Sequence, residues 1–218
     1  MARTKLVKTI IKDIENTITE LRSNGLLRDE NGICQNCSGE NVIELSYSGK
    51  NDTNKVIFDK HLSYSKLINE LLENRQYNIL MYDKSLIQAE FILDDNEILK
   101  ERLVFIKKHN RIWNKSEIDE CDALDEDWFS EEEGIPIVIR IDFSPKDHKE
   151  CEHSIAHFTL SNHECCRIPM KNAISFSEFI SFILRHFYNA KLNHPVHRFQ
   201  DSEVITEVEK KMIHINWK

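Results

Sequence analysis

Glycine and proline are scarce in this sequence, with five and four of the 218 residues. So low a content excludes collagen-like repeats and flexible low-complexity linkers as its main character. No apolar run approaches the roughly 18 residues that a membrane-spanning helix needs. The first residues also lack the continuous hydrophobic stretch of a secretory signal. We therefore expect a cytoplasmic protein with no membrane association.

Several short signatures of enzyme classes are missing or incomplete. The sequence has no glycine-rich phosphate-binding loop and no G-x-S-x-G nucleophile elbow. Ser63-Tyr-Ser-Lys66 has S-x-x-K spacing, but its companion motifs are absent. Arg102 and His109 fit a loose arginine–histidine spacing of helical ribonucleases, although this stretch predicts a strand. None of these patterns assigns an activity, so whether the protein is an enzyme, and whether it uses a cofactor, stays open.

Charge is unevenly distributed along a chain whose net charge is −8. Residues 117 to 133 carry ten acidic side chains and no Lys or Arg, directly after a basic stretch at residues 100 to 115. Ten carboxylates cannot be desolvated together, so the acidic run predicts a surface loop. Either the two charge blocks screen each other in solvent, or the basic stretch is a surface for nucleic acid or a protein partner.

Apolar periodicity predicts three helices and a set of strands. The helices are expected at residues 3–23, around 64–72, and at 175–188, where Ser175 and Glu178 form a capping box. The predicted strands are 42–47, 55–58, 78–82, 86–93, 102–106, 135–143, 154–160, 166–169 and, by alternation, 212–217. Short hairpins between the strands favour antiparallel pairing. We expect one α+β domain over residues 1–218, with a mainly antiparallel sheet, an N-terminal helix, a central helix, a C-terminal-half helix and an acidic loop at about 117–133.

A histidine pair suggests the strongest candidate site. His153 and His157 lie four residues apart on or beside one predicted strand, where the period of two places them on the same side. Asp142 on the preceding strand and Arg167 on the following one could join that face. Imidazoles with a carboxylate and an arginine could carry out general acid–base chemistry on a phosphodiester, or hold a metal. The candidate catalytic residues are therefore His153, His157, Arg167 and Asp142, unless they form only a polar sheet face.

Two other patterns allow alternative sites. His157-Phe-Thr159 and His61-Leu-Ser63 match the repeated motif of two-histidine phosphoesterases, in which each histidine acts as acid or base. Cys34-Gln-Asn-Cys37 has zinc-knuckle spacing, and His163, Cys165 and Cys166 could supply the missing ligands. Otherwise Cys34 and Cys37 are ordinary thiols beside a turn at Gly32 or Gly39.

A series of short motifs also resembles a known family. In order, they are Tyr77-Asn-Ile-Leu-Met-Tyr-Asp-Lys-Ser-Leu-Ile-Gln88, Glu101-Arg-Leu-Val-Phe105, Arg140-Ile-Asp-Phe143, Glu152-His-Ser-Ile-Ala-His-Phe-Thr159, Cys166-Arg-Ile-Pro169 and Phe179-Ile-Ser-Phe-Ile-Leu-Arg-His-Phe-Tyr188. Over about residues 5 to 190 the chain resembles the bacterial domain-of-unknown-function family 2290.

The resemblance implies a context rather than a mechanism. Some members of that family are encoded beside a helicase gene in two-gene antiphage defence systems. The expectation is an accessory or effector subunit that acts with a helicase partner on nucleic acid, which it could reach through that partner. The alternative is a stand-alone phosphodiester-cleaving enzyme of the nuclease or two-histidine phosphoesterase type. The resemblance implies no catalytic residues.

Overall fold

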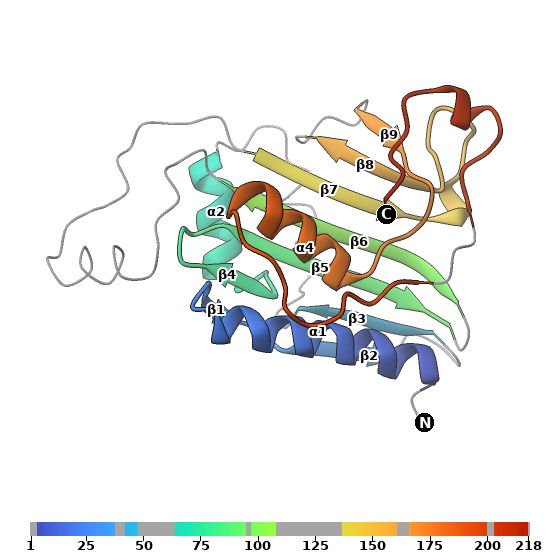
Figure 1. The fold of residues 1–218 in the computed structure, drawn as a ribbon. Coiled ribbons are helices and arrows are strands. Elements are labelled where there is room, and N and C mark those ends of the chain that lie inside the picture. The colour runs from blue at the N-terminus through green and yellow to red at the C-terminus, as the bar shows by residue number, and fades with distance from the viewer. Residues whose placement is uncertain are drawn as a thin grey trace, which may run out of the picture.

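The computed structural model describes residues 4–37, 42–47, 64–94, 97–107, 137–160, 166–199 and 203–217. In these residues a nine-stranded sheet lies between helices on both of its faces (Figure 1). Every pair of neighbouring strands is antiparallel. The predicted α+β class is therefore confirmed. The predicted strand 55–58 and the acidic segment 117–133 lie outside the described residues.

The sheet is a meander in its second half. Its strands are β1 (Leu27–Glu30), β2 (Ile33–Cys37), β3 (Ile43–Tyr47), β4 (Ile79–Met81), β5 (Leu86–Leu93), β6 (Ile98–Lys107), β7 (Ile137–Phe143), β8 (Ala156–Leu160) and β9 (Arg167–Pro169). They follow the order β1-β4-β5-β6-β7-β8-β9, and β3 pairs with the far end of β5 and with β2. Consecutive strands from β5 onward are thus neighbours in space.

Helices α1 (Lys5–Ser23) and α4 (Phe176–Phe187) pack side by side on one face of this sheet (Figure 1). The predicted apolar stripe of α1 is buried, and the helix is followed by Gly25 at φ 65°, the left-handed position that glycine favours. The predicted capping box of Ser175 and Glu178 is present at the start of α4. Alternate residues of the central strands, such as Phe105, meet both helices in the main core.

The opposite face of the sheet is only partly apolar. Helix α2 (Tyr64–Glu73) covers one end of it, where Ile68 and Leu71 share a smaller core with Leu86, Val104 and Ile106. Toward β7, β8 and β9 the same face carries arginine, aspartate, histidine and threonine. No described helix is long and apolar enough to cross a bilayer.

Two local predictions are wrong. Residues 212–217 do not form a strand, since only Ile215 bridges to Met170 and a single 3₁₀ turn, Glu209–Lys211, precedes it. Conversely, β1 and β2 lie where only a turn beside the cysteines was expected. These strands are short and rich in polar residues, so they lack the apolar alternation that identifies a strand from sequence.

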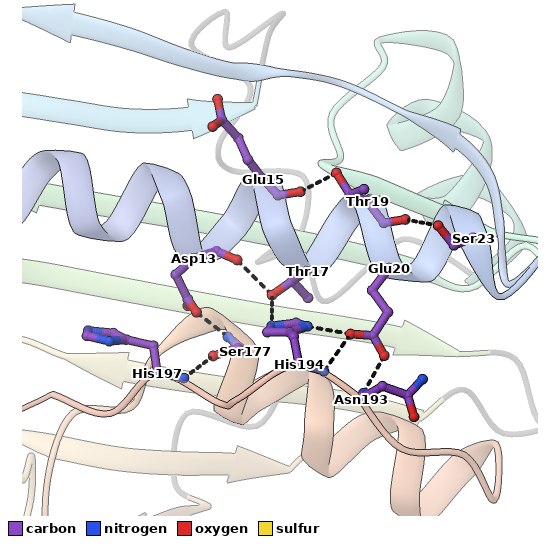
Figure 2. A network of polar contacts seen from close by, with 10 residues as sticks. All are labelled: Asp13, Glu15, Thr17, Thr19, Glu20, Ser23, Ser177, Asn193, His194 and His197. Carbon is purple, nitrogen blue, oxygen red and sulfur yellow. Dashed lines mark hydrogen bonds and ion pairs between the residues drawn. The ribbon is translucent and has the colours of Figure 1, made fainter.

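An irregular segment that follows α4 makes hydrogen bonds to both helices of the main core. We call residues 190–199 the strap; Figure 2 shows it bound to α1 and α4. The Glu20 carboxylate accepts the backbone N–H groups of Asn193 and His194 and also contacts His194 Nδ1. Ser177 Oγ accepts the backbone N–H of His197 at 2.9 Å, and the Ser177 N–H donates to Asp13 at 3.0 Å. The strap therefore ties the first helix to the last.

Candidate functional site

Strand register brings the polar side chains together on the sheet face away from α1 and α4. Ile139, Ile141 and Phe158 belong to the main core, so the intervening residues of β7 and β8 point to the other side. Across the strands, Arg102 is paired with Asp142 and Asp142 with His157, while Arg140 is paired with Thr159 and Thr159 with Arg167. We call this set, with His153, the polar face; its members are Arg102, Arg140, Asp142, His153, His157, Thr159 and Arg167.

Asp142 is the carboxylate at the centre of the polar face. Its Oδ1 accepts Arg102 Nε at 2.8 Å and its Oδ2 accepts Arg140 Nε at 2.5 Å, with 8% of the side chain exposed. Burial raises the pKa of Asp142, but the charges of Arg102 and Arg140 outweigh burial, so the pKa lies below its ordinary value. Asp142 is therefore ionised, and two guanidinium groups hold it in place.

His157 lies beside this carboxylate and is almost fully buried. Its Nδ1 is 3.0 Å from the carbonyl oxygen of Ser154, which can only accept, so we assign the proton to Nδ1. Its Nε2 lies 3.6 Å from Asp142 Oδ2. Burial lowers the pKa of His157 to about 4, although the Asp142 charge acts in the opposite direction. The imidazole is therefore neutral at physiological pH, and Nε2 keeps its lone pair.

His153 reaches the same place from a loop. It lies before β8, in the β7–β8 connection, where it bridges to Lys149. Its ring is 4.7 Å from that of His157, centroid to centroid, in a T-shaped arrangement. The two histidines therefore meet as predicted, but the reason is wrong: a loop, and not the period of a shared strand, places His153. Burial lowers the pKa of His153, and the nearby charge of Arg167 lowers it further.

Three buried polar atoms at the β8–β9 side of the polar face have no hydrogen-bond partner among the described residues. They are His153 Nδ1, Thr159 Oγ1 and Arg167 Nε. Among the described residues the Arg167 side chain makes one long hydrogen bond, from Nη1 to the carbonyl oxygen of Glu152 at 3.5 Å. A buried polar group left unpaired costs about 1–3 kcal/mol. A ligand with acceptor oxygens that reached these buried atoms would satisfy them.

The structure brings together all four residues proposed from the sequence. Arg102, Arg140 and Thr159 belong to the same cluster but were not grouped with it from the sequence, which placed Arg102 and Thr159 only in the alternative patterns. Their signal was present in the pairs Arg140-x-Asp142 and His157-x-Thr159, whose members share one side of a strand. That Arg102 faces Asp142 follows only from the cross-strand register, which cannot be read from the sequence.

The alternative sites fare differently. His61 and Ser63 of the two-histidine pattern, and His109 of the ribonuclease pattern, lie outside the described residues. Arg102 lies on strand β6 and binds Asp142, which does not suit a helical motif.

The zinc interpretation meets a geometric obstacle. Cys34 and Cys37 lie on β2, where residues three apart point to opposite faces, so their thiols do not converge. In the described part of the chain, no three His, Cys, Asp or Glu side chains form a group suited to a metal ion.

Comparison with known proteins identifies a family but no characterised relative. A family model described as an uncharacterized conserved protein, DUF2290, matches residues 26–217. The match begins after α1 and extends to the C-terminal segment, so it includes every residue of the polar face. No curated protein and no solved structure matches the chain.

Proposed function

We propose that this chain, which belongs to the DUF2290 family, is an accessory or effector subunit of a bacterial antiphage defence system and acts on nucleic acid together with a helicase. In this proposal the polar face binds the phosphate groups of the nucleic acid. Contact with phosphates requires no reading of base sequence, which suits a subunit that works beside a helicase.

The observation that carries the proposal is the set of unpaired atoms on His153, Thr159 and Arg167. A guanidinium N–H, a hydroxyl and an imidazole nitrogen can all donate to the oxygens of one phosphate. Arginine is especially suited to this anion because its planar fork donates in parallel. Arg167 has no ion-pair partner in the described part of the chain, so its charge is not already neutralised there.

The buried centre of the polar face supports the same ligand. Asp142 neutralises part of the charge of Arg102 and Arg140, and Glu90 lies opposite Arg102 on β5. The acidic groups named here lie on β5 and β7, whereas β9 carries Arg167 and no acidic residue. An anion would approach the β8–β9 side, where His153 and Arg167 are only partly buried.

Phosphodiester cleavage is a second candidate function, and the histidine pair favours it. A neutral His157 has a free lone pair at Nε2 and could take the proton of an attacking water. The protonated form of His153, which its lowered pKa makes scarce at neutral pH, could give a proton to the leaving oxygen as the phosphorus–oxygen bond breaks. Arg167 would stabilise the charge that develops on the phosphoryl oxygens. In this candidate function His153 touches the substrate, and the carbonyl oxygen of Ser154 holds His157 through its Nδ1–H.

A binding experiment tests the phosphate contact directly. Fluorescence anisotropy would measure the affinity of the purified protein for labelled single-stranded DNA, duplex DNA and single-stranded RNA at several salt concentrations. Arg167→Ala is expected to weaken binding about tenfold and to reduce the salt slope by about one. Arg185→Ala is the matched control, because Arg185 is exposed on α4 at the other face of the sheet. Equal losses in both variants would refute a phosphate site on the polar face.

A second experiment separates the accessory role from cleavage. The protein is tested for oligonucleotide hydrolysis alone and with the proposed helicase partner, and phage plating measures defence. Cleavage predicts that His157→Ala and His153→Ala abolish hydrolysis while binding persists. The accessory role predicts no hydrolysis by the chain alone, with stimulation of the helicase that Arg167→Ala removes. Failure to bind nucleic acid would contradict both candidates, and failure to affect the helicase would contradict the accessory role.

A further inference from the structure

A large open cleft lies on the helix side of the sheet, away from the polar face. Its volume is about 1000 Å³, at the upper end of the range for small-molecule pockets. The start of α1, the start of β6, the end of β7 and the strap form its walls. The cleft therefore lies where the first helix, the sheet and the strap meet.

The floor of the cleft is apolar. Side chains from five separate segments line it: Leu6, Ile98, Leu99, Phe143, Ile155, Ala173, Phe199 and Val204. Few polar groups interrupt this lining, and those of Thr9 and Asn172 are uncharged. Such a floor favours a ligand whose body carries few hydrogen-bonding atoms, because an unpaired polar atom placed there would lose its hydration.

Positive charge surrounds this floor. Lys5 and Lys146 are exposed, and neither has an ion-pair partner in the described part of the chain. Arg198 also lines the cleft and lies 3.6 Å from Glu178, with 65% of its side chain exposed. Glu97 is the single acidic residue among the lining residues. Because the whole chain has a net charge of −8, this local excess of cations is a specific feature of the cleft.

The strap holds one wall in a defined position. The backbone of His197 is fixed at both ends: its N–H donates to Ser177 and its carbonyl oxygen accepts Ser175 Oγ at 2.6 Å. The His197 ring then packs against Phe199 with centroids 5.6 Å apart. The Glu20 contacts to the strap in Figure 2 anchor the preceding residues. The aromatic wall is therefore organised before any ligand binds, which favours affinity.

We propose that this cleft binds a small amphipathic anion, with its apolar body on the floor and its carboxylate or phosphate near Lys5, Lys146 and Arg198. An acyl carboxylate and the head and chain of an anionic lipid share this chemistry. The site lies on the other face of the sheet from the polar face, so it is separate from nucleic-acid binding.

Titration calorimetry of the full chain with three probes tests the proposal. Laurate is the free anion, dodecanol is its neutral counterpart, and phosphatidylglycerol vesicles present the anion in a membrane. Saturable binding of laurate, with much weaker binding of dodecanol, is expected. Binding of the vesicles without binding of laurate would overturn the proposal in favour of a membrane-docking surface. Absence of binding by laurate at millimolar concentration would also overturn it.

Charge variants assign the binding to the cleft. The double variant Lys5→Glu with Lys146→Glu is expected to weaken laurate binding about tenfold or more and to leave dodecanol binding unchanged. Both residues are exposed, so the variant should fold normally, and its melting temperature checks this. Lys12→Glu, an exposed lysine of α1 that does not line the cleft, is the control. An equal loss in Lys12→Glu would show nonspecific charge attraction and overturn the proposal.

Discussion

His157 shows how one residue can couple the polar face to pH. An unfolded imidazole titrates near 6.5, whereas burial lowers the pKa of His157 in the folded protein to about 4. Between these values the unfolded chain binds more protons than the folded one. The contribution of His157 to stability is therefore complete above pH 6.5 and is lost as the pH falls toward 4, by about 3 kcal/mol in total.

His157→Asn is expected to remove this part of the pH dependence. The free energy of unfolding of the wild type should fall more between pH 7 and pH 4.5 than that of the variant. Urea unfolding at both pH values measures the difference. His214→Asn serves as the control because His214 is exposed, so it should keep the wild-type dependence. A wild-type slope in His157→Asn would mean that another group is responsible.

Glu101 is a buried carboxyl group of a different kind. It lies on β6 on the core side, and neither oxygen accepts a well-formed hydrogen bond from a described residue. Burial raises the pKa of Glu101 well above its ordinary value of 4.5, although the nearby backbone amide of Ile174 favours the charged form. A raised pKa means that the contribution of Glu101 to stability is complete below pH 4.5 and is lost as the pH rises.

Glu101→Gln should therefore stabilise the protein at pH 8 and have little effect at pH 4. The amide has the shape of the protonated acid and cannot ionise, so folding no longer has to keep a carboxyl group neutral. Thermal unfolding at the two pH values gives the comparison, with exposed Glu150→Gln as the control. A melting temperature for Glu101→Gln below that of the wild type at pH 8 would contradict this account.

At the scale of elements, α4 is the helix on which the main core depends. Phe176, Phe179, Ile180 and Ile183 are at most 1% exposed and face the sheet and α1. Phe179→Ala should cost about 3–5 kcal/mol, because it removes a ring from a packed interior and leaves a cavity. Chemical denaturation measures this loss. Arg185→Ala, on the exposed side of the same helix, should change stability by no more than about 0.5 kcal/mol.

The strap depends on Glu20 in a similar way. Burial raises the pKa of Glu20, but hydrogen bonds from Asn193 and His194 outweigh it and lower the pKa below its ordinary value of 4.5. The stabilisation by the ionised carboxylate is thus present at neutral pH and is lost as the pH falls below 4.5. Acidification should loosen the strap before the sheet unfolds.

Glu20→Gln is expected to loosen the strap at neutral pH. The amide cannot accept as strongly from two backbone N–H groups, and the loss of a charged acceptor costs about 1–3 kcal/mol. Hydrogen exchange at Asn193 and His194 should accelerate, while exchange in β6 should not change. Glu15→Gln tests specificity, since the side chain of Glu15 in Figure 2 points away from the strap. Unchanged exchange in Glu20→Gln would show that the strap is held by other contacts.

At the scale of the whole molecule, the sequence predicts the elements that carry their own periodicity. Helices α1 and α4 bury one regular face, and strands β5 to β8 place every second residue in the main core, so their positions follow from local spacing. The positions of strands β1 and β2 do not follow from local spacing, because pairing with β4 and β3, and not their own apolar pattern, makes them strands. The alternating segment 212–217 shows the converse: it meets the edge of the sheet beside β9 at Ile215 alone, so its alternation does not produce a strand.

The same distinction applies to the candidate site. Asp142, His157 and Arg167 could be grouped from strand period and hairpin order. The strand period could not place His153 beside them, because His153 lies in the loop before β8 and its position depends on how that loop folds. The roles of Arg102 and Glu101, adjacent residues facing opposite sides of β6, depend on which side the helices cover. That information belongs to tertiary packing and is not present in any short stretch of sequence.

The contacts of α1 with α4 and the strap also determine when the N-terminal part of the chain can finish folding during synthesis. Asp13 and Ser177 are separated by 164 residues, and Glu20 and His194 by 174. Helix α1 leaves the ribosome before α4 and the strap that cover it. The apolar stripe of α1 therefore stays exposed, or bound by a chaperone, until α4 and the strap have emerged. A nascent chain arrested before residue 175 should therefore bind chaperones that a chain extended past residue 199 does not.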